Sequence, residues 1–197
     1  MNNYTEQTFS LPELTGISTK SVSEHLKLYS GYVKNANLIL EKIKEYANTG
    51  EQHAYAISEL QRRFSFEFNG MRNHEYYFKS LEGGATPLTD TTTLHQKIVK
   101  QWGSFDGWLN RFKTIAATRG VGWAILYYDP ITDQLTNAWV EEQHLGQLNG
   151  LAYVIGIDMW EHSYYMDYGT DKKKYIEAFF ANLNWRVAEQ NLSTMMK

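Results

Sequence analysis

The sequence predicts an α+β fold, in which a long N-terminal α-helical hairpin precedes a C-terminal α/β domain with a small three-stranded antiparallel sheet. Apolar residues recur every three or four positions over two long segments that a short polar turn separates, which favours the hairpin. Beyond Gly120 the pattern changes to short runs rich in aromatic and β-branched residues, which favours the sheet. The chain is punctuated after the second long segment by Gly83-Gly84-Ala85-Thr86-Pro87. We therefore expect a domain boundary there, with a helical hairpin domain over 1–86 and an α+β domain over 87–197.

The first predicted helix follows an extended lead-in, and Ser18 or Thr19 can cap its start. Its stripe of apolar residues consists of Val22, Leu26, Tyr29, Val33, Ala36, Leu40, Ile43 and Ala47. Asn48-Thr49-Gly50 is expected to end it. The second helix is expected over roughly 53–80, where one face carries Ile57, Leu60, Phe64, Met71, His74 and Phe78.

The C-terminal part is expected to begin with two shorter helices, over 92–101 and 105–118, that Gly103-Ser104 separates. Strands over 121–128 and 135–140 are predicted to form a β-hairpin around the turn at 129–133. A third strand over 151–157 is apolar enough to be central. Helices over 172–183 and 185–195 are expected to close the chain.

Composition excludes several classes of function. Nineteen Lys and Arg against 22 Asp and Glu give a formal net charge of −3, which argues against nucleic acid or an anionic membrane as a partner. The absence of cysteine excludes disulfides, thiol nucleophiles and zinc–thiolate sites. The polar start shows no signal-peptide pattern and no apolar run is long enough to span a bilayer, so we expect a cytoplasmic protein.

Two of the six histidines lie on the apolar faces of the predicted hairpin, His25 on the first helix and His74 on the second. Burying an imidazole costs free energy unless it forms hydrogen bonds or binds a metal. From periodicity alone, each is more typical of a hydrogen-bonded core histidine than of a ligand. His53 and His95 are expected at the surface.

Asp158 and His162 lie four residues apart, just beyond the third strand, and can converge on one cation. A carboxylate oxygen with imidazole nitrogens suits manganese, iron or zinc. Spacing alone leaves the more ordinary interpretation ahead, in which Asp158 caps a helix and His162 is unrelated to it.

Residues 158–165 read Asp158-Met159-Trp160-Glu161-His162-Ser163-Tyr164-Tyr165. This segment closely resembles the D-x-W-E-H-A-Y-Y signature of iron/manganese superoxide dismutases, with Ser163 in place of the usual Ala. Further segments resemble that family in the same order and extend the resemblance over nearly the whole chain: Leu11-Pro12-Glu13-Leu14, Asn73-His74 with Tyr76, Tyr77 and Phe78, Gly120-Val121-Gly122-Trp123, and Asn184-Trp185.

This resemblance implies an oxidoreductase that disproportionates superoxide to O2 and H2O2. One manganese or iron ion per subunit would cycle between the +2 and +3 states. The resemblance implies that the metal ligands are His25, His74, Asp158 and His162, two from each half of the chain. Zinc on the same ligands would be redox-silent.

In this family a Gln, or sometimes a His, reaches the metal-bound solvent from one of two positions. The iron-type position corresponds here to Gly70, and the manganese-type position falls within 141–144, where we choose Gln143 over the neighbouring His144. An ordinary polar-loop glutamine is the alternative interpretation. Gly70, Gln143 and Gly156 match the manganese-type pattern better, so manganese is expected, with iron as the alternative.

The resemblance also suggests roles around the metal. Tyr32 would join Gln143 in a hydrogen-bond chain that helps to relay protons, and Tyr77 would line the approach. Trp123 and Trp160 would form the cavity wall.

Glu161 and Tyr165 resemble residues that cross the subunit boundary in this family, where Glu161 would reach the partner's His162. A homodimer, or a tetramer built from it, is therefore expected.

One segment departs from the family pattern. The family has H-x-x-x-H-H-x-x-Y, whereas the stretch from His25 to Tyr32 is one residue shorter and lacks both internal histidines. The histidine that normally meets the other subunit is thus missing, and Tyr29 is expected to fill part of its space.

Three other functions remain as alternatives. A non-catalytic helical metal-binding protein, such as a di-iron carboxylate bundle, needs paired Glu-x-x-His motifs, which are not found in that arrangement. A mononuclear iron oxygenase uses two His and one carboxylate, and four ligands leave too few open positions for it. A structural homologue without activity is disfavoured because these residues are intact: His25, Tyr32, His74, Asp158 and His162.

Overall fold

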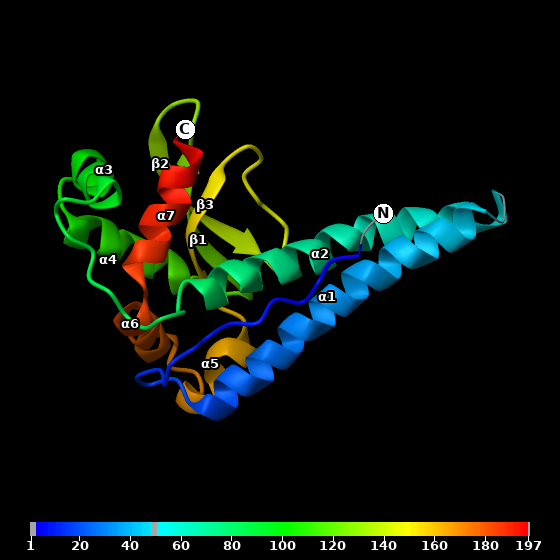
Figure 1. The fold of residues 1–197 in the computed structure, drawn as a ribbon, viewed down its shortest axis with the longest axis horizontal. Helices are drawn as coiled ribbons and strands as arrows, with labels where there is room; N and C mark the ends of the chain where they lie inside the picture. Colours follow the sequence, from blue (N-terminus) through cyan, green and yellow to red (C-terminus); the bar gives the residue numbers. More distant parts are fainter. Residues whose placement is uncertain (1–2, 49–50, 197) are drawn as a thin grey trace.

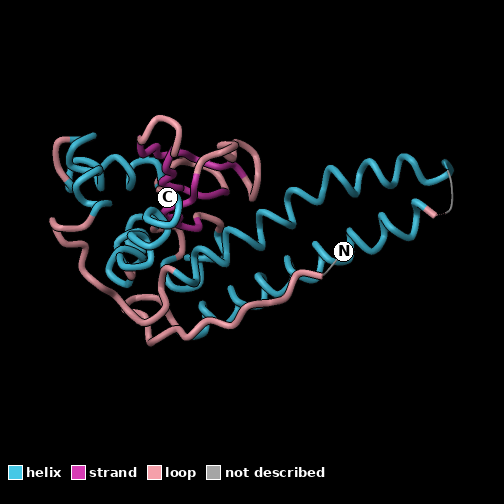
Figure 2. The backbone as a smooth tube through the Cα atoms, turned by 45° about the horizontal axis from the view of Figure 1, so that its top comes forward, coloured by secondary structure: helices cyan, strands magenta, loops and turns pink. Residues whose placement is uncertain are grey.

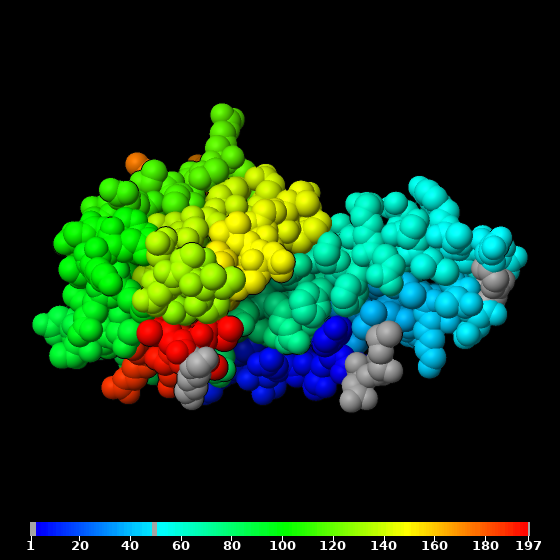
Figure 3. All heavy atoms as spheres, turned by 90° about the horizontal axis from the view of Figure 1, so that it is seen from above, coloured from blue at the N-terminus to red at the C-terminus, as the bar shows by residue number. Residues whose placement is uncertain are grey.

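The computed structural model describes residues 3–48 and 51–196 and begins with the expected helical hairpin (Figure 1). Helices α1 (Thr19–Ala47) and α2 (Ala54–Lys79) run side by side, and a short 3-10 turn, η1 (Glu51–His53), leads into α2 (Figure 2). Seen from above, the hairpin projects well beyond the rest of the molecule (Figure 3). Thr49 and Gly50 of the predicted turn lie outside the described residues.

Helix α1 begins where the sequence predicts, because the Ser18 side chain accepts a hydrogen bond from the Ser21 amide. Its buried face consists of Ser21, His25, Tyr29, Val33, Ala36 and Ile39. Val22 and Leu26 are only half-buried, at the edge of that face. His25 therefore lies within the buried face of α1.

The second half of the chain contains, in order, α3 (Thr93–Trp102), α4 (Phe105–Ala116), β1 (Gly122–Asp129), β2 (Gln134–Glu141), β3 (Ala152–Asp158), α5 (Glu161–Tyr168), α6 (Lys172–Asn182) and α7 (Trp185–Met195). Gly103 ends α3 with a left-handed φ of 82°, and the Ser104 side chain caps α4 by accepting from the Gly107 amide.

The three strands form one antiparallel sheet in the order β2-β1-β3, which confirms the predicted α+β class. The prediction that the third strand is central was wrong, because β1 lies between the other two. Helices α2 and α7 pack against β3 (Figure 1). The apolar sequence of β3 thus reflects burial under helices rather than a strand on each side.

Helix α5 was not predicted from the sequence. It has only eight residues and begins three residues after β3 ends, so it is too short for a periodic apolar pattern to reveal it. Its first turn carries His162.

One hydrophobic core runs from the hairpin into the sheet and its covering helices, with Tyr29, Trp108, Trp123 and Tyr175 fully buried within it. The division into domains at residue 86 stays a prediction. Within residues 3–48 and 51–196, every helix is too short or too polar to cross a lipid bilayer.

Candidate metal centre

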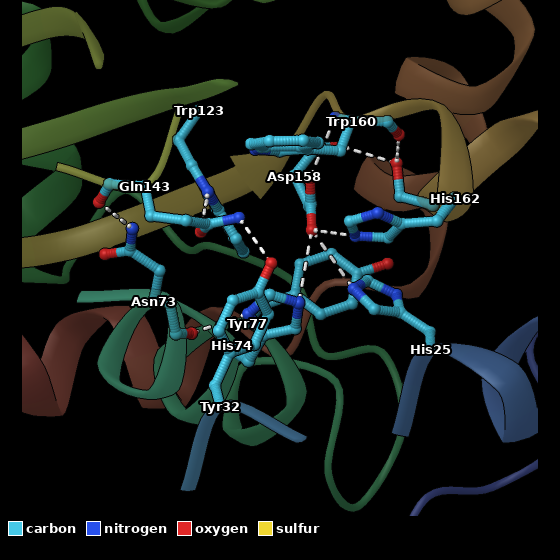
Figure 4. Close-up of polar contacts among 12 residues, drawn as sticks. His25, Tyr32, Asn73, His74, Tyr77, Trp123, Gln143, Asp158, Trp160 and His162 are labelled. Atoms are coloured by element: carbon cyan, nitrogen blue, oxygen red, sulfur yellow. Dashed lines mark hydrogen bonds and ion pairs between the residues drawn. The ribbon is translucent and has the colours of Figure 1, made fainter. Parts of the chain in front are cut away.

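Four side chains from four elements meet beneath the sheet edge (Figure 4). His25 comes from α1, His74 from α2, Asp158 from the last position of β3 and His162 from α5. The Asp158 Oδ2 atom lies 3.1 Å from His25 Nε2, 3.1 Å from His162 Nε2 and 3.5 Å from His74 Nε2. One ligand atom from each of the four residues lies within 4.8 Å of all the others. One cation can therefore contact all four side chains.

The cluster is closed to solvent except beside His162. His74 and Asp158 are 0% exposed and His25 is 3% exposed, whereas the His162 side chain is 22% exposed. A small solute can therefore approach from the side of His162.

His74 shows most directly that the cluster fits a cation. Its Nδ1 donates a hydrogen bond to the Gly70 carbonyl at 2.6 Å, which leaves the lone pair of Nε2 facing the Asp158 carboxylate. Among the described residues this buried Nε2 has no hydrogen-bond partner. A nitrogen lone pair and a carboxylate oxygen repel each other unless a cation lies between them, so the donor set fits a metal ion.

Burial sets the protonation states that a metal needs. It lowers the pKa of His25, and burial together with the neighbouring His25 lowers the pKa of His74 to about 3. Burial alone would raise the pKa of Asp158, but the charge and hydrogen bond of His162, with those of His25, hold it well below its usual range. Neutral imidazoles and an ionised carboxylate are the ligating forms.

The metal-free protein is expected to lose stability as the pH falls from 6.5 towards 3. The unfolded chain protonates His74 near the usual 6.5, whereas the folded chain does so only at about 3, so protons favour unfolding across this window. A histidine whose pKa is lowered by burial reduces the free energy of unfolding by about 1.4 kcal/mol for each pH unit within this window. Above pH 6.5 the histidine is neutral in both states, so this effect is absent. Urea unfolding of the metal-free protein at a series of pH values measures it. Constant stability between pH 6.5 and 4 would contradict the burial of a neutral His74.

Comparison with known proteins agrees with this geometry. Residues 90–191 match the family model described as "Iron/manganese superoxide dismutases, C-terminal domain". The "Superoxide dismutase [Mn/Fe]" of Aeropyrum pernix is 34% identical over 173 residues, which cover 85% of this chain and 78% of the relative. The chain belongs to the iron/manganese superoxide dismutase family. The "Superoxide dismutase [Fe]" of Cupriavidus metallidurans is 32% identical over 94% of this chain and 93% of its own length. The "Superoxide dismutase [Mn]" of Mycolicibacterium fortuitum is 33% identical over 82% of this chain and 77% of its own length.

Gln143 lies beside the cluster, as the family resemblance leads one to expect. It is 0% exposed, its Oε1 accepts from Trp123 Nε1 at 2.8 Å, and its Nε2 donates to the Tyr32 hydroxyl at 3.0 Å. The Tyr32 ring lies 5.0 Å from the His74 ring. His144 instead packs edge-on against Phe66, with 5.7 Å between ring centroids. Gln143, rather than its neighbour, is therefore the residue that joins Tyr32.

Gly70, at the iron-type position of the family, makes room for Tyr32. A Cβ atom on Gly70 would lie 2.5 Å from Tyr32 Cδ1, so the tyrosine ring lies directly against the backbone of α2. Since α1 is an uninterrupted helix, the seven residues from His25 to Tyr32 span nearly two turns and keep both on one face.

The predicted wall residues surround the cluster at different depths. The Trp123 ring lies 5.2 Å from His74, and the Trp160 ring stacks 5.9 Å from His162. Tyr77 is 2% exposed and lies 5.1 Å from His25, with its hydroxyl bonded to Tyr175 at 3.1 Å. Tyr77 is thus buried against His25, and its place along the approach to the metal stays a prediction.

The other three predicted residues differ in burial, since Tyr29 is buried whereas Glu161 and Tyr165 are exposed. The Tyr29 hydroxyl accepts from the Gln7 amide and donates to Glu75, while its ring packs against Phe9. Glu161 and Tyr165 are exposed on α5, and their place in a subunit contact stays a prediction.

The sequence interpretation assigned no role to Phe66. Its ring lies 6.0 Å from Tyr32 and 6.3 Å from Trp160, and the Arg63 guanidinium stands 3.6 Å from its centroid. Phe66 thus contributes to the wall beside Tyr32. Its position eight residues before His74 on the same predicted helix was the only signal available.

Proposed function

We propose that this protein disproportionates superoxide to O2 and H2O2 with one manganese or iron ion per subunit. His25, His74, Asp158 and His162 would hold the ion. The observation that carries this proposal is the convergence of three imidazole nitrogens on Asp158 Oδ2, with one nitrogen buried and lacking a hydrogen-bond partner among the described residues. Family membership supports the same chemistry.

A manganese or iron ion supplies a one-electron change between its +2 and +3 states. With three neutral imidazoles and one carboxylate as ligands, the charge of the centre would change only between +1 and +2. The fully buried Trp123 and His74 exclude bulk water from the inner side.

Tyr32 and Gln143 are proposed to hold and pass the protons that peroxide formation consumes. The Gln143 amide connects Tyr32 to Trp123 in one hydrogen-bonded chain. Burial raises the pKa of Tyr32, so its phenol stays protonated and can donate.

Manganese is the favoured ion in this proposal. Gly70 and Gln143 follow the manganese-type pattern, and Gly156 does so two residues before Asp158. A Cβ on Gly156 would overlap the Tyr153 hydroxyl at 1.6 Å, so the packing around β3 requires glycine there. Affinity for divalent ions follows the Irving–Williams order, so availability decides which ion is loaded.

A cytoplasmic homodimer, or a tetramer built from it, completes the proposal. The net charge of −3 gives no support to nucleic acid or an anionic membrane as a partner. The exposed Glu161 and the 57% exposed Tyr165 flank His162 on α5, where a second subunit could cover the open side of the cluster. Sedimentation of the wild type and of Tyr165→Ala tests this assembly.

Elemental analysis and a superoxide-removal assay, after separate loading with manganese and iron, test the function. We expect about one ion per chain and activity with at least one of the two metals. Stoichiometric metal without superoxide removal in either form would instead support the non-catalytic metal-binding alternative.

Gln143→Ala is expected to retain metal but to shift its reduction potential. The substitution removes the amide that links Tyr32 to Trp123 and leaves the four ligands intact. His144→Ala is the matched control, and redox titration of the two variants is the measurement. A shift in the control with none in Gln143→Ala would place the solvent contact at residue 144.

A further inference from the structure

We propose that Gln147 is a positioning residue that fixes Gln143 in the loop after β2 and separates it from solvent. This inference rests on the proposed role of Gln143 beside the metal. Gln147 belongs to none of the segments that resemble the family, and it lies four residues beyond Gln143 in an irregular stretch.

The side chain of Gln147 joins three parts of the fold. Its Nε2 donates to Asn73 Oδ1 at 3.2 Å and to the Gln143 carbonyl at 3.3 Å. Asn73 Nδ2, on α2, donates to that same carbonyl at 3.0 Å. The Tyr127 hydroxyl, on β1, donates to Gln147 Oε1. The Gln143 backbone is thus tied to α2 and to the central strand through one amide group.

Backbone hydrogen bonds between Glu141 and Leu145 close this loop, but the carbonyl of Gln143 inside it is bound by side chains. Glu142, directly before Gln143, has a left-handed φ of 52°, which a non-glycine residue keeps only when its surroundings enforce it. The Glu142 carbonyl, just before Gln143 in the chain, accepts a hydrogen bond from Trp160 Nε1 at 3.1 Å. Asn73 and Gln147 bind the Gln143 carbonyl itself. With the carbonyl fixed, the side-chain amide of Gln143 reaches Trp123 and Tyr32 together.

Gln147 also borders a surface cavity of about 500 Å³, whose lining includes Asn73, Tyr127 and Tyr153. Gln143 itself is 0% exposed and does not line that cavity. Removal of the Gln147 amide would leave the Gln143 carbonyl with one protein donor and let water compete for the other position. The Gln147 side chain therefore keeps this side of the site dry.

Gln147→Met tests the proposal, because methionine keeps the length of the side chain and removes its donors and acceptor. The probe is the indole N–H of Trp123, which donates to Gln143 Oε1 and so reports the position of that amide without any metal. In the metal-free protein we expect a shift of this ¹H–¹⁵N resonance and exchange with solvent about fivefold faster or more. The exposed Gln134, at the start of β2, gives the matched control Gln134→Met, which should leave the resonance unchanged.

In the metal-loaded protein, Gln147→Met should retain the ion and shift its reduction potential in the same direction as Gln143→Ala. An unmoved Trp123 resonance in Gln147→Met would overturn the inference. If Gln147→Met does not fold, Tyr127→Phe removes the hydroxyl that donates to Gln147 Oε1, and an unmoved Trp123 resonance in that variant overturns the inference. A moved resonance in a protein without superoxide-removing activity would reject the proposed function and leave the positioning role standing.

Discussion

His74→Ala is expected to abolish metal retention, with bound manganese or iron falling below about a tenth of the wild-type content after purification. His74 is one of the four donors of the cluster and is 0% exposed, so His74→Ala removes one ligand from a buried site. Loss of a residue that only supports a ligand costs about 10–100-fold in metal affinity, and loss of the ligand itself should cost more. Superoxide removal should disappear with the metal. Elemental analysis of the purified variant is the direct measurement.

The matched control for this experiment is His53→Ala, at the distal start of α2 and outside the cluster. Its metal content and activity should equal those of the wild type. Thermal unfolding adds a second readout, because a ligand at about 1,000 times its Kd stabilises the folded state by about 4 kcal/mol. Added metal should raise the Tm of the wild type and of His53→Ala but not that of His74→Ala. A His74→Ala variant with full metal content would refute the ligand assignment.

Gly70→Ala and Gly31→Ala should change stability in opposite directions, although both replace a glycine inside a hairpin helix. A Cβ at Gly31 meets no atom within 4 Å, so the higher helix propensity of alanine should stabilise the protein by about 0.5–1 kcal/mol. A Cβ at Gly70 would lie 2.5 Å from the Tyr32 ring, and overpacking of this kind costs about 1–3 kcal/mol.

Gly70→Ala should also impair function, because the displaced Tyr32 ring loses its hydrogen bond from Gln143. Loss of one proton-transfer group reduces turnover by about 100-fold or more. Urea unfolding and steady-state superoxide removal, measured on both variants at equal metal content, separate the two effects. Equal stability of the two variants would show that Tyr32 does not lie against the backbone of α2.

The hairpin was predictable because a 3.6-residue period over more than 20 residues is a strong signal. Strand order was not, because the apolar sequence of β3 records contact with α2 and α7 and says nothing of its neighbours in the sheet. Helix α5 escaped prediction because eight residues give only about two turns.

In the candidate site, features that depend on neighbouring residues could be predicted from the sequence, whereas contacts between distant residues could not. The apolar faces indicated burial of His25 and His74, but their convergence with Asp158 came only from the resemblance, since pairing across 133 residues leaves no periodic trace. Gln143 and His144 are both polar and adjacent in sequence, and only the folded structure shows that Gln143 bonds to Tyr32 while His144 packs against Phe66. The contacts proposed for Gln147 include Asn73 and Tyr127, which are distant in sequence, as well as the carbonyl of Gln143, so no local sequence pattern could reveal its role.

The four donors are spread from residue 25 to residue 162, which has a consequence for the maturation of the enzyme. While the chain emerges from the ribosome, the completed hairpin can present only two of the four donors, and Asp158 and His162 become available only after β3 and the start of α5 have been synthesised. Stable capture of the ion must therefore await docking of the late segments onto the early ones.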